Sequence, residues 1–268
     1  MPPDQTAVTA HFDDLLALAS ELALEAGTLV REGRIGGLVD VETKSTPTDA
    51  VTEYDRAAEA LIVGRLRQAR PDDGIVGEEG TADIGTSGIH WLIDPIDGTT
   101  NYLYRLPLYS VSIAARDGDG GVVGVVHAPM TNEMFAARRG GGAFVNGRPI
   151  TCSDQRFLGS TLVATGFGYL PERRARQGER VANLIAEVRD IRRLGSAAID
   201  LCYVAAGRFD AYYEQWLNPW DLAAGELIAR EAGAMIGEFP GRDEGEPAGL
   251  LAASPGIYDE MKALLARS

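Results

Sequence analysis

The sequence has few of the residues that build disulfide-linked or zinc-binding proteins. Its 268 residues include only two cysteines, Cys152 and Cys202, and three histidines. Two cysteines that lie far apart in the sequence form neither a disulfide framework nor a zinc-binding motif. They fit a reducing compartment, so we expect a cytoplasmic protein.

Positive charge is also scarce. Lysine and arginine together number 25 against 39 aspartates and glutamates, which gives a formal net charge of -14. Nucleic acids and anionic membrane surfaces attract basic proteins, so we expect non-specific binding to neither. The surplus acids are instead candidates for binding metal ions.

The amino-terminal part lacks the features of a targeting segment. Its charged residues Asp4, Asp13 and Asp14 follow no basic region, and Glu21 interrupts the first apolar stretch. This pattern predicts neither a signal peptide nor a membrane span. The hydrophobic content of 45% and charged content of 24% are typical of a globular protein.

Two helices and a run of short strands are expected in the first part of the chain. Apolar residues recur at helical spacing over residues 12–33 and again from about Asp49 to Ala69, before Pro71. Shorter β-rich runs follow, separated by turns rich in glycine, which predicts an antiparallel meander. These expected strands are 74–77, 91–94, 109–115, 122–127, 134–137 and 143–145.

Beyond about residue 150, expected strands alternate with expected helices. The strands are 162–165, 191–194, 209–214, 234–236 and 250–253, and the helices are 174–188, 197–206, one that starts after Asp221, and one from about 257. Because no repeat or low-complexity linker is present, we expect one domain over residues 1–268. It would have lobes at about 1–150 and 151–268.

The most informative stretch is residues 91–100, an apolar run that ends in acids, a glycine and two threonines. Asp94 precedes a proline, so we expect it to be the last residue of a buried strand. Gly98 lets a ligand approach the backbone, and Thr99 and Thr100 are expected to begin a helix whose free N–H groups attract an anion. The stretch predicts a metal site beside a phosphate site.

Two other segments also end an apolar run with acids. Glu78 and Glu79 follow the expected strand 74–77, and Asp221 follows Trp220 just before a helix. Mg²⁺ prefers oxygen ligands, so carboxylates from separate elements could together hold two or three ions. The structural alternatives are that the glutamates cap a loop and that Asp221 is a helix N-cap.

Together these segments resemble the inositol monophosphatase family of metal-dependent, lithium-sensitive phosphatases. The shared features are Gly-Glu-Glu at residues 77–79, Asp-Pro-Ile-Asp-Gly-Thr at 94–99 and Trp-Asp at 220–221. Residues 44–52 and 194–198 also match, so the resemblance covers most of the chain. It implies an α/β fold, a layered αβαβα sandwich, in a protein that forms homodimers.

The resemblance also implies a set of metal ligands for two to three Mg²⁺ ions. Glu78, Asp94 and the backbone carbonyl of Ile96 would bind the first ion. Asp94, Asp97 and Asp221 would bind the second, and Glu78 would also face a third, more weakly bound ion. In such two-metal sites one ion activates water and the other stabilises the leaving alkoxide.

Further residues are assigned roles in the reaction by the same resemblance. Asp49 and Thr99 would position and activate the attacking water, and Lys44 would steady the Asp49 region or a phosphate oxygen. Backbone N–H groups of Gly98 and Thr99 would receive the phosphate. The three histidines lie outside the matched segments, so we expect structural roles for them.

Substrate recognition is expected in the second lobe. The resemblance makes Glu214 the acceptor of a hydrogen bond from a ring hydroxyl, with Asp97 near another hydroxyl and the Ala197 backbone on the same wall. The structural alternative for Glu214 is a solvated strand end. The basic cluster at residues 173–176 is either a solvated helix face or a contact for an anionic group.

The sequence therefore predicts a Mg²⁺-dependent phosphatase acting on a small phosphomonoester, myo-inositol 1-phosphate. Two enzymatic alternatives share the metal-binding segments, namely a histidinol-phosphate phosphatase and a 3′-phosphoadenosine 5′-phosphate phosphatase. A non-enzymatic alternative is a regulatory binding protein on the same fold.

Overall fold

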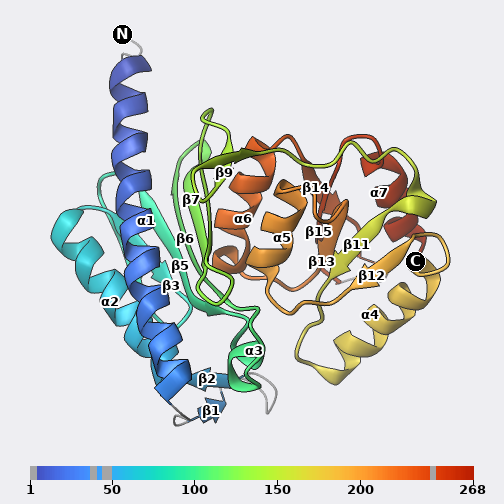
Figure 1. Cartoon of the computed structure of the whole chain (residues 1–268), viewed down its shortest axis with the longest axis horizontal. Helices are drawn as coiled ribbons and strands as arrows, with labels where there is room; N and C mark the ends of the chain where they lie inside the picture. Colours follow the sequence, from blue (N-terminus) through green and yellow to red (C-terminus); the bar gives the residue numbers. More distant parts are fainter. Residues whose placement is uncertain (1–4, 37–40, 44–49, 242–245) are drawn as a thin grey trace.

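Two β-sheets alternate with three layers of helices (Figure 1). The computed structural model describes residues 5–36, 41–43, 50–241 and 246–268. The helices are α1 (Gln5–Gly36), α2 (Glu53–Ala69), α3 (Thr99–Leu103), α4 (Pro171–Leu184), α5 (Ala197–Ala205), α6 (Pro219–Glu231) and α7 (Tyr258–Arg267). Of these helices in the described ranges, none is long and apolar enough to cross a lipid bilayer.

The strands form one large sheet, one smaller sheet and a separate pair. The pair is β1 (Val41–Thr43) and β2 (Ala50–Thr52). The large sheet has the order β10 (Arg148–Ile150), β9 (Ala143–Val145), β8 (Glu133–Arg138), β7 (Gly120–Ala128), β6 (Ser110–Asp117), β5 (His90–Asp97), β3 (Gly74–Gly77), β4 (Ala82–Asp83). The smaller sheet has the order β12 (Asp190–Arg192), β11 (Leu162–Thr165), β13 (Ala211–Glu214), β15 (Gly249–Ala253), β14 (Met235–Phe239).

Each sheet is covered by helices on both faces, so the expected αβαβα sandwich is confirmed. Helices α1 and α2 pack on one face of the large sheet and α6 packs on the other. Helix α5 packs against α6 and against the smaller sheet, whose far face meets α7. A sheet with both faces covered needs apolar residues on both faces, and β6 and β7 bury nearly every residue.

The layer between the sheets depends on small residues where helix and strand meet. A Cβ atom added at Gly124 of β7 would lie 2.7 Å from the Ala224 carbonyl oxygen of α6. No side chain fits in that space, so the glycine lets α6 lie directly against the sheet.

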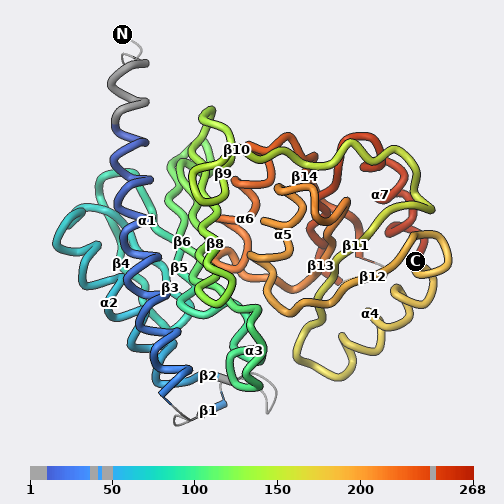
Figure 2. The backbone as a smooth tube through the Cα atoms, in the orientation of Figure 1, coloured from blue at the N-terminus to red at the C-terminus, as the bar shows by residue number. Residues whose placement is uncertain are grey.

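Figure 2 shows the chain after β10 crossing the molecule to reach the second sheet.

Most expected elements are present, but the second helix begins later than predicted. Helix α2 starts at Glu53, not near Asp49, because residues 50–52 form strand β2. Thr52 is the N-cap. Its side chain accepts hydrogen bonds from the backbone N–H groups of Tyr54 and Asp55, and the Asp55 carboxylate accepts one from the Thr52 N–H at 2.8 Å. This capping box sets the helix start.

The prediction that Asp94 ends its strand was wrong. Strand β5 continues to Asp97, with an irregularity between Asp94 and Asp97 where three residue steps on β5 match two on β6. Pro95 has no N–H to donate, and such residues are tolerated at bulges. The extra residue changes the direction of the following side chains, so that Asp94 and Asp97 line the same cavity.

Candidate active site

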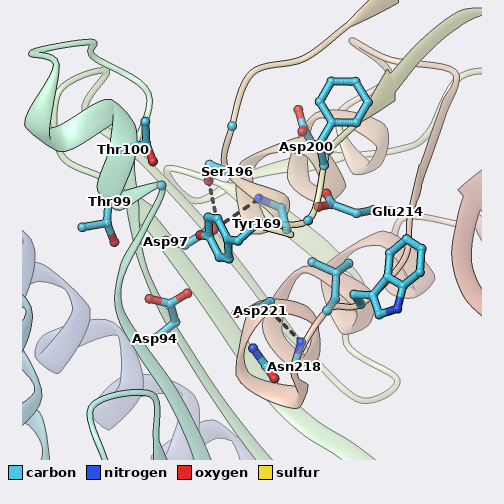
Figure 3. A pocket seen from close by; sticks show the side chains of 18 of the residues that line it. Asp94, Asp97, Thr99, Thr100, Tyr169, Ser196, Asp200, Glu214, Asn218 and Asp221 are labelled. Atoms are coloured by element: carbon cyan, nitrogen blue, oxygen red, sulfur yellow. Dashed lines mark hydrogen bonds between the residues drawn. The ribbon is translucent and has the colours of Figure 1, made fainter. Parts of the chain in front are cut away.

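Nine of the predicted site residues line one cavity of about 520 Å³. They are Glu78, Asp94, Ile96, Asp97, Gly98, Thr99, Ala197, Glu214 and Asp221. The cavity lies where the carboxyl ends of β3, β5 and β13 meet the first residues of α3, α5 and α6 (Figure 3). Lys44 and Asp49, the other two predicted residues, lie outside the described residues.

Asp97 joins the large sheet to the first turn of α5. Its carboxylate accepts hydrogen bonds from the Ser196 hydroxyl and from the backbone N–H groups of Ala198 at 2.8 Å and Ala197 at 3.3 Å. Burial raises the pKa of Asp97 to about 6, although these three donors favour the charged form. The Ala197 backbone lies in the cavity wall, where its N–H is bonded to Asp97.

Glu78 is placed by a second, buried glutamate. Glu59 of α2 is 4% exposed and accepts hydrogen bonds from the Glu79 N–H at 2.7 Å and the Thr81 hydroxyl at 2.7 Å. The Glu78 N–H donates to the Ile93 carbonyl of β5 at 3.1 Å. These bonds fix the turn after β3, so Glu78 lines the cavity beside Asp94.

Asp221 combines a structural contact with a place in the cavity. Helix α6 begins at Pro219 with Asn218 as its N-cap, so Asp221 is the third residue of the helix and not its N-cap. Its Oδ2 accepts a hydrogen bond from the Asn218 N–H at 2.7 Å, which completes a capping box. The cap holds the carboxylate in the cavity wall (Figure 3).

The acids at the inner end of the cavity disfavour one another's charged forms. Burial raises the pKa of Asp94 well above its usual value, and repulsion from Glu78, Asp97 and Asp221 adds to the increase. Burial also raises the pKa of Asp221. Within the described residues, Asp94, Asp97 and Asp221 form no salt bridge with lysine or arginine. Buried, mutually repelling carboxylates of this kind gain stability from a cation.

This donor set has the chemistry of a magnesium site. It offers carboxylate oxygens from separate elements together with the Ile96 carbonyl, which are the hard ligands that Mg²⁺ prefers. Within the described ranges, no three histidine, cysteine, aspartate or glutamate side chains are already arranged to hold one ion. The fit therefore rests on the donor types and on their unbalanced charge.

Thr99 has a partner that the sequence did not predict. Its hydroxyl lies 3.2 Å from Asp55 Oδ1 and 3.0 Å from the Ile96 carbonyl oxygen. Asp55 is 1% exposed and belongs to the capping box of α2. The spacing of Thr52 and Asp55 predicts such a box, but nothing in the sequence pairs Asp55 with a residue 44 positions later.

Gly98 is required by its backbone conformation and by close neighbours. Its φ of 93° lies in the left-handed region that favours glycine. A Cβ atom there would lie 3.0 Å from the Gly195 carbonyl oxygen and 3.1 Å from that of Leu108. Both features require glycine at the start of α3. The anion contact expected for its backbone stays a prediction.

Comparison with known proteins agrees with this geometry. The sequence model of the inositol monophosphatase family matches residues 11–268. The chain belongs to this family. It is 43% identical over 271 residues to the inositol-1-monophosphatase of Mycobacterium bovis, covering 94% of this chain and 93% of the relative.

Two other relatives of this inositol monophosphatase family member carry different names. The Nus factor SuhB of Salmonella typhimurium is 41% identical, with 94% of each chain covered. The crystal structure of the extragenic suppressor protein suhB from Bartonella henselae superposes with a TM-score of 0.88 at 36% identity, covering 95% of this chain and 99% of that one.

Glu214 lies on the far wall of the cavity from Asp94 (Figure 3). Its Oε2 accepts a hydrogen bond from the Tyr212 hydroxyl at 2.7 Å. Burial raises its pKa to about 7, although that bond and the positive charge of Arg193 act in the opposite direction. A Cβ atom at Gly166 would collide with the carboxylate, so glycine leaves room for it.

None of the three histidines lines the cavity. His127 is buried, and its Nδ1 lies 3.0 Å from the Ala23 carbonyl oxygen, which joins β7 to α1. His90 is exposed at the start of β5. These positions agree with the structural roles expected for them.

Proposed function

We propose that the protein is a Mg²⁺-dependent phosphomonoesterase that hydrolyses myo-inositol 1-phosphate to inositol and phosphate. The observation that carries the proposal is the group of mutually repelling carboxylates beside the first turn of α3. Membership of the inositol monophosphatase family supports a phosphatase; the substrate and the metal are our proposals.

The metal ligands follow the family resemblance. Glu78, Asp94 and the Ile96 carbonyl would hold one Mg²⁺, and Asp94, Asp97 and Asp221 a second, with Glu78 also facing a third. Bound ions of this kind lower the pKa of water and stabilise the leaving oxygen.

Thr99 is the residue that would orient the attacking water. Its hydroxyl is held by the buried Asp55 carboxylate and the Ile96 carbonyl, which fixes its orientation at the cavity wall. We therefore add Asp55 as a positioning residue for Thr99. The roles of Asp49 and Lys44 stay predictions.

Phosphate and ring would contact different walls. The N–H groups of Gly98 and Thr99 would donate to phosphate oxygens, because the first N–H groups of a helix have no partner within it. Glu214 would accept a hydrogen bond from a ring hydroxyl, with Asp97 near another and the Ala197 backbone beside it. A carboxylate forms short, strong bonds to hydroxyls, which favours a polyol.

A panel of phosphomonoesters tests the proposal. Purified protein with Mg²⁺ would be given inositol 1-phosphate, histidinol phosphate and 3′-phosphoadenosine 5′-phosphate, and kcat/KM would be measured from released phosphate. We expect the highest value for inositol 1-phosphate. A higher value for either other compound would identify that alternative, and release from none would contradict the phosphatase.

A second candidate function is a regulatory binding role on the same fold. It is favoured by the relative that is named a Nus factor. The complete set of acids at the cavity favours catalysis, since a binding role has no evident need for mutually repelling carboxylates. A protein inactive towards the whole panel would favour the regulatory role.

Three further properties remain proposals from the family resemblance and from composition. We infer a homodimer, a cytoplasmic location and inhibition by lithium. Sedimentation, cell fractionation and phosphate release in the presence of Li⁺ would test them in turn.

A further inference from the structure

One buried acid in the cavity wall has no role in the reaction proposed above. Asp200 lies in the first turn of α5 and lines the cavity, although only 1% of its surface is exposed. Among the residues that the structure describes, its Oδ1 atom has no hydrogen-bond partner. Leaving a buried polar atom unbonded costs free energy, so an atom of this kind in a cavity wall is a candidate contact for a ligand.

The groups around Asp200 do not supply the missing bond. The buried Tyr212 hydroxyl donates to Glu214 Oε2 at 2.7 Å. A hydroxyl has a single proton, so Tyr212 cannot donate to Asp200 at the same time. The positive charge of Arg193 acts to lower the pKa of both acids, yet within the described ranges it forms a salt bridge with neither of them. Asp200 therefore keeps an open position for a hydrogen bond.

Asp200 and Glu214 lie on the same side of the cavity, away from Asp94 (Figure 3). Burial raises the pKa of Asp200 well above its usual value, and the negative charge of Glu214 adds to the increase. Charges affect one another in this way only over short distances, so the two carboxyl groups are neighbours. This wall thus offers two acids from different elements, α5 and β13.

Both acids are held by regular secondary structure. The Asp200 N–H donates to the Ser196 carbonyl at 3.0 Å, and the Ser196 hydroxyl donates to Asp97. Glu214 ends β13, which pairs with β11 on one side and β15 on the other. Helix α5 packs against β13, so the spacing of the two acids is set before any ligand binds.

We propose that Asp200 binds a hydroxyl group of the substrate, adjacent to the hydroxyl that Glu214 would bind. A hydroxyl both donates and accepts hydrogen bonds, and a carboxyl group offers it an acceptor in either protonation state. A second anionic group would be repelled by the two acids, which makes a pair of neighbouring hydroxyls the fitting ligand. Asp200 then selects phosphates of polyols that carry adjacent ring hydroxyls. This inference rests on the phosphatase function proposed above.

Monodeoxy analogues of myo-inositol 1-phosphate test this pairing. We would measure kcat/KM for the parent compound and each analogue in wild type, Asp200→Ala and Glu214→Ala. In wild type, loss of either of two neighbouring hydroxyls should lower kcat/KM tenfold or more. One of these two losses should disappear in Asp200→Ala and the other in Glu214→Ala, because the bond is then already missing. If Asp200→Ala shows the same loss as wild type for every analogue, the inference is overturned.

A structural role for Asp200 gives a different result. An acid in the first turn of a helix can stabilise that helix, and its removal would then lower kcat/KM for the parent and all analogues equally. Asp200→Leu is a second variant, which fills a similar space without hydrogen-bonding atoms and should behave as Asp200→Ala does. The matched control is Asp73→Asn. It changes a buried acid outside the cavity, so each analogue should keep its loss within twofold of wild type.

Binding of the product separates this inference from the phosphatase function. Calorimetric titration of myo-inositol into protein with Mg²⁺ and inorganic phosphate requires no turnover. We expect Asp200→Ala to weaken this binding tenfold or more. Equal affinity in the variant, or no binding by wild type, would overturn the role of Asp200. Weaker binding by the variant, combined with no phosphate release from the substrate panel, would support that role and contradict only the phosphatase.

Discussion

Buried carboxylates lie at both ends of the β3–β5 strand pair, and their surroundings differ. Asp73, just before β3, accepts hydrogen bonds from Arg70 at 2.8 Å, Ser87 at 2.6 Å and Trp91 at 2.9 Å. Burial raises its pKa, but these donors outweigh burial and hold the pKa below its usual value. At the other end, the pKa of Asp94 is raised.

The difference separates an acid whose charge is compensated within the protein from acids that we propose bind metal ions. Asp73 is neutralised by residues of its own chain, so its charge is compensated as soon as the protein folds. The acids at the carboxyl ends repel one another, which costs stability unless a cation binds. Substitutions at one end at a time test whether the two ends have these separate roles.

The largest expected effect is on catalysis at the carboxyl end. Asp94→Asn should lower kcat/KM about a thousandfold, because Asp94 would be a shared ligand of the two proposed metal ions, which stabilise the transition state by several kcal/mol. The melting temperature of the metal-free variant should not be lower than that of the metal-free wild type, since the change removes a repelling charge. Phosphate release and thermal unfolding would be measured on the same protein. Full activity would contradict the metal assignment.

The next effect concerns the Thr99 hydroxyl, which we propose orients the attacking water. Thr99→Val should lower kcat about a hundredfold, in the range seen for groups that assist proton transfer. KM should change little, because the backbone N–H at this position remains. Steady-state kinetics would show this split. An unchanged kcat would remove Thr99, and with it Asp55, from the reaction.

At the opposite end the effect should be on stability alone. Asp73→Asn should lower the free energy of unfolding by roughly 2–3 kcal/mol, because it leaves the buried Trp91 N–H and the half-buried Arg70 without their charged acceptor. Activity per folded molecule should match wild type. Urea denaturation would measure the free energy of unfolding, and the phosphate assay would measure activity. Unchanged stability, or a lower activity per folded molecule, would contradict this prediction.

The smallest effect is a difference in pH dependence. Because the pKa of Glu214 is raised to about 7, its contribution to stability is present below its usual pKa of 4.5 and is lost as pH rises through 7. Between pH 6 and 7, metal-free wild type should therefore lose about 1 kcal/mol more stability than Glu214→Gln. Asp73 acts with the opposite sign, and its stabilisation is lost as pH falls below about 4. Parallel curves for the two proteins would contradict the raised pKa.

Local patterns predicted most of the fold. The strands of the large sheet and the alternation of strands and helices after residue 150 follow from apolar periodicity and turn residues, which act over a few positions. Element ends were less predictable. The strand expected at 191–194 ends at Arg192, which leaves Arg193 free to reach the cavity.

Features that depend on distant partners escaped prediction. The irregularity in β5 depends on its pairing with β6, and the contact of Asp55 with Thr99 joins α2 to α3. Arg173 lines the cavity only because α4 packs beside the loop that carries Trp216. A sequence pattern reports neighbours along the chain, so contacts of this kind carry no local mark.

The amino-acid sequence alone predicted that these acids follow apolar strands, since apolar periodicity is a local property. Only the folded chain shows which acids lie together without a salt bridge among the described residues, that the Thr99 hydroxyl meets Asp55, and that Arg173 and Arg193 line the same cavity. Charge compensation depends on distance in space, and the chain fixes those distances only when both sheets pack against α5 and α6.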